Sequence, residues 1–128
     1  MKSIKSALLL IALMTLLLGC GPFGAGERGQ VDIRGNITSI HRADTQSQEK
    51  SIMGSILIEG AIEEDTQFDK ASVTITEETR IFEQEGQERH QVTFDALQVG
   101  QRVEARFTGP VMESYPVQAT AREIVILK

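Results

Sequence analysis

Acidic side chains are the residues of this sequence that most plainly could do chemistry. Glu63, Glu64, Asp65 and Asp69 lie close together, and carboxylates at such spacing could hold Ca²⁺, which takes about six to eight oxygen ligands. The spacing of an EF-hand loop is absent, and the segment has no glycine for the sharp turn that such a loop needs. Charge runs of this kind are commonly solvated. An ion site over residues 63–69 is therefore the alternative to a solvated acidic loop.

His41 and His90 are the only histidines, and 49 positions separate them. Two histidines and a carboxylate could bind zinc, but nothing in this spacing supports such a site. A serine, a histidine and an acid can meet in space without any sequence signature, so a hydrolase stays open as a hypothesis. Because no catalytic motif accompanies the histidines, we predict a protein that is not an enzyme and has no metal or cofactor.

The single cysteine, Cys20, directly follows an apolar run over residues 7–18. A membrane-spanning helix needs about 20 apolar residues, and this run of 12 is too short. Its length suits the apolar region of an export signal, and Lys2 and Lys5 supply the positive start of such a signal. We therefore expect the rest of the chain to be sent across the membrane.

Residues 17–20, LLGC, resemble a bacterial lipobox. In that pattern a leucine stands three positions before an invariant cysteine, and a small residue stands directly before the cysteine. Leu17 and Gly19 match the pattern, and Leu18 departs mildly from it. The thiolate of Cys20 is the nucleophile that takes up lipid.

The lipobox resemblance implies that a diacylglyceryl group is attached to Cys20 and that residues 1–19 are removed as a signal peptide. Acyl chains anchor stably when two are present, so we expect the protein on the outer face of the cell membrane. Residues 20–29, which are rich in glycine, form a flexible tether to one domain over residues 30–128. An ordinary signal cut after Ala25 and an uncleaved short anchor are the alternatives.

The charge of the mature chain excludes some classes of partner. Removal of residues 1–19 takes away Lys2 and Lys5, which leaves 109 residues with 11 basic and 18 acidic side chains and a net charge of about −7. Anionic lipid headgroups and nucleic acid repel such a surface. The chain has no tryptophan and one tyrosine, so stacking platforms for bases or sugars are scarce.

Apolar and polar residues alternate through most of the mature chain, and this period of two predicts β-strands. In the first strand Val31, Ile33 and Ile37 share the inner face with Gly35, whose place in mid-strand indicates a bulge or tight bend. The predicted strands cover residues 31–38, 51–60, 70–76, 79–82, 101–109 and 117–127. A hairpin loop over residues 83–89 turns around Gly86, and residues 90–94 bring the chain back.

Two details of the strand pattern concern the later part of the chain. Residues 93–100 predict one helical turn, with Leu97 and Val99 plugging one end of a barrel. In 101–109, Val103, Ala105 and Phe107 are expected to point inward and Arg102, Glu104 and Arg106 outward. The apolar phase switches near Arg122-Glu123, which indicates a β-bulge.

Short strands without room for a long helix predict an all-β fold. The best fit is a small OB-like barrel, closed or partly open, of five to six strands with one short helical turn. A β-sandwich is the second choice, because β-rich chains of this size are hard to separate by pattern.

Several stretches resemble the YobA-like family of small lipoproteins from Gram-positive bacteria, a group without an assigned function. They are GNITSI at 35–40, ILIEG at 56–60, TITEETRIF at 74–82, FDALQVGQRVEARFTGPV at 94–111 and ESYPVQATAREIVIL at 113–127. The resemblance covers most of residues 31–127 and implies an OB-like barrel on a lipid anchor. It implies no activity.

Glu113, Tyr115 and Pro116 form the candidate contact with a partner. The tyrosine stands before a proline, which disfavours helical backbone at that position. In OB-like barrels the loops and one face bind the partner, so Tyr115 could contact a glycan or a peptide. The pattern favours the alternative, in which Tyr115 seals the barrel end and Pro116 protects an edge strand.

These features together predict a membrane-anchored, non-enzymatic interaction or ligand-binding module of the cell envelope. Its expected partners are the membrane, through Cys20, and an envelope protein or glycan, with no nucleic acid. The alternative is a calcium- or metal-responsive envelope protein that uses the loop over residues 63–69.

Overall fold

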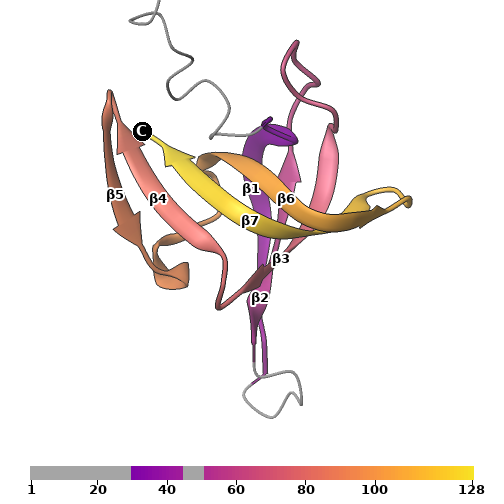
Figure 1. Cartoon of the computed structure of the whole chain (residues 1–128), viewed down its shortest axis with the longest axis horizontal. Coiled ribbons are helices and arrows are strands. Elements are labelled where there is room, and N and C mark those ends of the chain that lie inside the picture. Colours follow the sequence, from indigo (N-terminus) through magenta and orange to yellow (C-terminus); the bar gives the residue numbers. More distant parts are fainter. Residues whose placement is uncertain (1–29, 45–50) are drawn as a thin grey trace, which may run out of the picture.

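The computed structural model describes residues 30–44 and 51–128. Seven strands and one short helical turn make up this part of the chain (Figure 1). The elements are β1 (Ile33–Arg42), β2 (Ile52–Glu59), β3 (Lys70–Thr76), β4 (Arg80–Glu85), β5 (Glu88–Val92), the 3₁₀ turn η1 (Phe94–Ala96), β6 (Arg102–Met112) and β7 (Val117–Leu127). The predicted all-β class and the single helical turn are confirmed.

Five strands close into a ring. The sheet runs in the order β3-β2-β1-β6-β7, and β3 pairs with β7 to complete the circle. The β3–β7 pair is parallel, whereas the other four neighbouring pairs of the ring are antiparallel. Strands β4 and β5 form a hairpin outside the ring, and β4 pairs in parallel with the C-terminal half of β7. The OB-like expectation thus holds in its essential feature, a small ring of five strands.

The inner face of the ring holds the hydrophobic core. Alternating apolar residues place their side chains there because successive residues of a strand point to opposite faces. Burial of each large aliphatic side chain contributes about 1.5–3 kcal/mol. The largest fully buried side chains of this core are Ile33, Ile37, Ile56, Ile58, Val73, Ile75, Val103, Ile124 and Ile126. Val125 is buried on the opposite face of β7, where it is opposite Phe82 of β4. The inward positions predicted for the first and third strands are confirmed.

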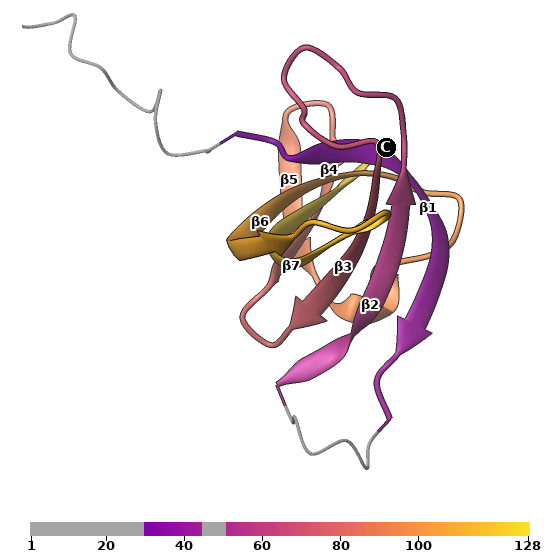
Figure 2. The same cartoon turned by 90° about the vertical axis from the view of Figure 1, so that its right-hand side faces the viewer.

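Gly35 marks a close approach between β1 and the end of β2. A Cβ atom added at Gly35 would lie 2.3 Å from the carbonyl oxygen of Glu59, so no other residue fits without movement of the backbone. The bulge of β1 lies further along, where the register against β2 shifts between Ile37 and Ser39. Figure 2 shows β1 bending strongly as it passes from β6 to β2.

A second bulge interrupts β6 and β7, where the apolar phase was expected to switch. Arg106 is opposite Glu123 and Phe107 is opposite Ala121, which leaves Arg122 as the extra residue of β7. The predicted bulge is confirmed. Arg106 points away from the core, as predicted, and its guanidinium lies near Glu104 and Glu123 on the outer side of the sheet, but the residue is only 6 % exposed.

The β4–β5 hairpin turns at Gly86, as predicted, with φ of 61° at that glycine. The chain then passes through η1 to β6, and Leu97 is buried in the core. Val99 is 63 % exposed, so the expectation that it plugs one end of the ring is wrong. The chain turns outward there because Gly100 has a positive φ and donates its N–H to the carbonyl of Ile37.

The predicted signal peptide, the lipid site Cys20 and the tether over residues 20–29 lie outside the described residues. Within the ranges 30–44 and 51–128, no helix is long and apolar enough to cross a membrane.

Substitution of Gly35 by alanine is expected to lower the free energy of unfolding by about 3 kcal/mol, because the new methyl group would overlap the Glu59 carbonyl. Thermal unfolding followed by circular dichroism measures the loss. Gly86→Asn is the control, since its Cβ meets no atom within 4 Å and asparagine tolerates positive φ. Equal stability of Gly35→Ala and the unmodified protein would contradict the close approach.

Candidate functional site

Tyr115 lies in the loop between β6 and β7 and is 72 % exposed. Its hydroxyl donates a hydrogen bond to Oδ2 of Asp69 over 3.2 Å. The Nζ atom of Lys70 lies 6.0 Å from the centroid of the tyrosine ring. The expectation that Tyr115 seals the end of the ring of strands is therefore wrong. Its phenol group is exposed to solvent and lies beside the start of β3.

The neighbours of Tyr115 complete an exposed loop. Glu113 is exposed and Pro116 is half-buried, and the peptide bond between Tyr115 and Pro116 is cis. Ser114 donates its hydroxyl hydrogen to the carbonyl oxygen of Pro116 over 2.7 Å. Met112, which precedes this loop, is 61 % exposed. The predicted contact residues thus lie together with a second large apolar side chain at one end of β6 and β7.

Outward-facing residues of four ring strands form an uncharged face beside this loop. The register places Ser55 opposite Thr74, Thr74 opposite Thr120, and Thr120 opposite Thr108. Neighbouring strands lie about 4.8 Å apart, so these hydroxyl groups follow one another at regular intervals around the ring.

A second row of the same face carries Ser72 opposite Gln118, and Gln118 is in turn opposite Met112. We call the combined set of six polar residues the hydroxyl face. It consists of Ser55, Ser72, Thr74, Thr108, Gln118 and Thr120. None of the six carries a charge, in a protein whose net charge is −5.

Two shallow grooves flank Thr120 on the hydroxyl face. One of about 430 Å³ is lined by Thr74 and Gln118 and bounded by residues 110–112. The other, of about 270 Å³, is lined by Thr108 and extends toward Arg122. Hydroxyl and amide groups both donate and accept hydrogen bonds, so the face suits a ligand with many hydroxyl groups. Sequence reasoning missed it, although the signal was present in the polar half of the strand alternation.

The acidic loop between β2 and β3 is held by arginines. The guanidinium of Arg34 on β1 donates hydrogen bonds to Glu63 and to both carboxylate oxygens of Asp65, the latter over 2.7 and 3.0 Å. Arg102 on β6 donates to the other oxygen of Glu63 over 3.0 Å. The hydrogen bonds from Arg34 lower the pKa of Asp65, and the bond to Asp65 is the largest cause that raises the pKa of Arg34.

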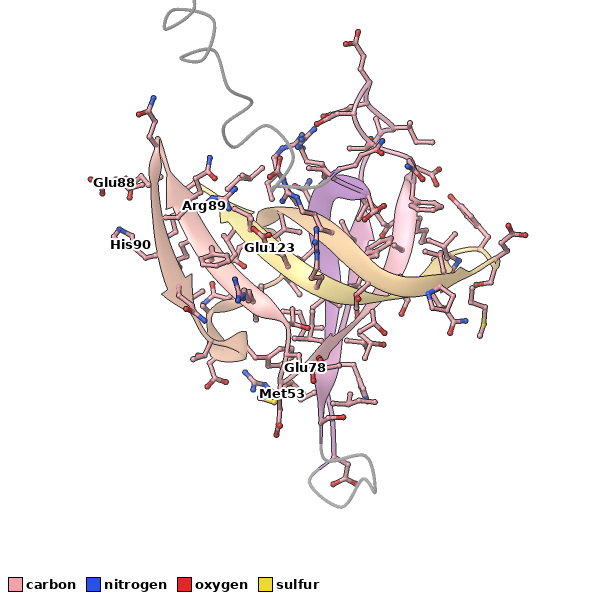
Figure 3. The ribbon with its side chains drawn as sticks, in the orientation of Figure 1. Met53, Glu78, Glu88, Arg89, His90 and Glu123 are labelled. Atoms are coloured by element: carbon pink, nitrogen blue, oxygen red, sulfur yellow. The ribbon has the colours of Figure 1, made fainter. Side chains whose placement is uncertain are left out.

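Charges of alternating sign continue from Arg34 across the outside of the sheet. Arg34 donates to Glu104 over 2.8 Å. The buried guanidinium of Arg106 lies 3.9 Å from both Glu104 and Glu123. Arg89 on β5 donates to Glu123 over 3.0 Å, and Figure 3 shows these two side chains turned toward each other. These ion pairs connect the hairpin to the ring. The charged side chains on the outside of the sheet therefore have a structural role.

The described residues contain no group of three or more histidine, cysteine, aspartate or glutamate side chains that could hold a metal ion. Glu63 and Asp65 are bound to arginine, and Asp69 accepts the hydrogen bond from Tyr115. His41 at the end of β1 and His90 on β5 are exposed and lie on strands that are not neighbours. The structure therefore brings Glu63 and Asp65 together on the guanidinium of Arg34 and leaves Asp69 with Tyr115, and it does not bring the two histidines together.

Comparison with known proteins identifies a family without a known activity. A family model described as "Protein of unknown function (DUF3221)" matches residues 46–128, which include β2 to β7. No curated protein and no solved structure matches the chain significantly.

Ionisation of Tyr115 is expected above the ordinary tyrosine pKa of 10.0, because the hydrogen bond to Asp69 and the charge of Asp69 both favour the neutral phenol. The contribution of this hydrogen bond to stability is present below that pH and is lost as pH rises through the raised pKa. Since Tyr115 is the only tyrosine and tryptophan is absent, ultraviolet absorbance against pH measures this group alone.

Asp69→Asn is expected to bring the titration midpoint of Tyr115 down toward its ordinary value. Glu113→Gln, which removes one charge from the loop and leaves Asp69 in place, is the control. A midpoint that responds equally to both variants would show that general charge, rather than the Asp69 hydrogen bond, sets the pKa.

Millimolar calcium is expected to leave the melting temperature unchanged within about 1 °C, because arginines already neutralise the carboxylates of Glu63 and Asp65. The measurement is thermal unfolding with calcium and with a chelator. Arg34→Gln, which releases Asp65 and leaves Glu63 with Arg102 alone, tests whether the loop takes up calcium once Arg34 is gone. A rise of more than about 3 °C in the unmodified protein would contradict the expectation.

Proposed function

We propose that this chain, which belongs to the DUF3221 family of proteins of unknown function, is a lipid-anchored, non-enzymatic module that binds a glycan of the bacterial cell envelope. The observation that carries the proposal is the hydroxyl face with its two grooves beside the exposed Tyr115 loop. The six residues of the face offer hydrogen-bonding groups and carry no charge, and Glu78 and Arg122 are the charged residues that line the second groove.

The anchor part of the proposal rests on the N-terminal sequence. The short apolar run, the two early lysines and the lipobox-like LLGC are features of an exported lipoprotein. The resemblance to YobA-like lipoproteins of Gram-positive bacteria supports the same location. Attachment through Cys20 would hold the domain within tether length of the membrane surface, where cell-wall polymers are concentrated.

The choice of a glycan over a charged polymer follows from electrostatics. The mature chain carries a net charge of about −7, which repels anionic wall polymers and nucleic acid. Hydroxyls of a neutral sugar can exchange hydrogen bonds with Thr74, Gln118 and Thr120 without desolvating an ion. Tyr115 adds an exposed aromatic ring and Met112 an exposed apolar side chain next to this face, and both can cover the apolar faces of sugar rings.

Binding to neutral glycan strands, prepared from cell walls and freed of peptides and anionic polymers, is expected to weaken about tenfold in Ser72→Lys and Gln118→Lys variants. A lysine at either position introduces a charge and removes a hydrogen-bonding partner. Co-sedimentation of the full-length protein with the strands measures the affinity. The control is Asn36→Lys, which adds the same charge at an exposed position on β1, a strand that contributes no residue to the hydroxyl face.

Cross-linking on intact cells that make a tagged protein, followed by mass spectrometry, tests the setting in which binding occurs. Cys20→Ala should lose the anchor and leave the membrane fraction. Capture of glycan from the anchored protein alone supports the proposal. Capture of one envelope protein, with no binding to glycan strands, would replace it by a protein-binding role.

A further inference from the structure

Strand β5 is the open end of the sheet. It pairs with β4 on one side, and no described strand pairs with its other side. Each of its five residues is exposed or half-buried. Such an edge presents backbone N–H and C=O groups that can pair with an additional strand.

An apolar cleft of about 370 Å³ lies where the β4–β5 hairpin leaves the ring. It opens between the base of the hairpin and the ends of β2 and β3. The apolar side chains that line it are Met53, Ile75, Ile81, Val92 and Phe94. Met53 is 42 % exposed and forms part of the mouth, which Figure 3 places at the end of the molecule near Glu78.

The cleft and the free edge share one face of the hairpin. Ile81 and Val92 are opposite each other, and the next pairs on the same face are Glu83–His90 and Glu85–Glu88. Figure 3 shows Glu88 and His90 pointing away from Arg89, which turns back toward Glu123. A residue added opposite Val92 would point to the same side as Val92, because cross-strand neighbours share a face. Its side chain would therefore be directed at the cleft.

Carboxylates lie beyond the cleft on the same face of the hairpin. Along β5, His90 follows Val92 at an interval of two residues and the exposed Glu88 follows His90, while β4 places Glu83 and Glu85 opposite them. Glu83 lies 3.3 Å from Lys128, and Glu77 adds a carboxylate to the lining of the cleft itself. The free edge therefore offers one apolar position at Val92 and, four residues away, an acidic position where Glu88 is opposite Glu85.

We propose that β5 accepts an extended basic peptide segment as an additional strand. One apolar side chain of the peptide occupies the cleft, and a lysine or arginine side chain four residues away pairs with Glu88, which is opposite Glu85. A second copy of this chain does not fit the same site, because its own net charge of −5 and acidic edge would be repelled. The hydroxyl face shares no residue with this site, so the two proposals stand or fall separately.

The probe is a fluorescent synthetic peptide, Lys-Thr-Lys-Thr-Leu-Thr-Lys-Thr-Lys, which reads the same in both directions and can pair in parallel or antiparallel. Fluorescence anisotropy with the full-length protein is expected to show saturable binding. Amide NMR shifts are expected to concentrate on residues 88–92 and on the cleft. Replacement of the peptide leucine by serine should weaken binding about tenfold, because the cleft then stays empty.

Glu88→Lys is expected to weaken binding about fivefold, because an attraction across the strand pair becomes a repulsion. The matched control is Glu64→Lys, an equal charge reversal at an exposed position in the β2–β3 loop. Equal losses in the two variants, equal binding of the serine peptide, NMR shifts away from β5, or no binding at millimolar peptide would each overturn the proposal. Melting temperatures of both variants establish that the fold is kept.

Discussion

The parallel pairing of β3 with β7 is the interaction on which the rest of the structure depends. It joins Ala71–Thr74 to Val117–Thr120 and turns a twisted sheet into a ring. Closure gives the alternating strands one shared interior, where the isoleucines and valines lose their contact with water. Closure also gives every strand of the ring a hydrogen-bonded neighbour on each side. On β7, β4 pairs with the residues that follow the segment paired with β3. The hairpin then carries β5, the strand that has a described neighbour on one side only.

Electrostatics divides the outside of this ring into surfaces of different chemistry. Arg34 and Arg102 neutralise the acidic loop, and Arg106 lies between Glu104 and Glu123 at the junction with the hairpin. Such partly buried pairs act mainly by fixing the positions of their elements, since the cost of desolvation offsets much of the attraction. The charges are thereby concentrated over β1, β6 and the hairpin. The six residues of the hydroxyl face, on β2, β3, β6 and β7, carry no charge, and the acid of the β5 edge stays exposed.

Local pattern was enough to predict the strands, the Gly86 turn and the bulge at Arg122, because each depends on residues near one another in the sequence. The inward positions of Ile33 and Val73 followed from alternation alone. The burial of Arg106 could not be predicted, since it depends on a bulge in the partner strand and on Glu123, 17 positions away. The exposure of Tyr115 depends on Asp69, and the cleft depends on how the hairpin leaves the ring. The exposure of Tyr115 and the shape of the cleft both depend on contacts between segments distant in sequence, and the periodicity of apolar residues does not predict such contacts.

The place of β7 in the sheet has a consequence for the order of folding. This strand pairs with β3, β4 and β6, so three separate parts of the sheet depend on the strand that comes last in the described residues. The contact between β3 and β7 spans 46 positions, and contacts so distant in sequence slow the search for the native topology. The ring therefore cannot close before β7 is available. Until then the isoleucines and valines of the earlier strands have no shared interior to enter.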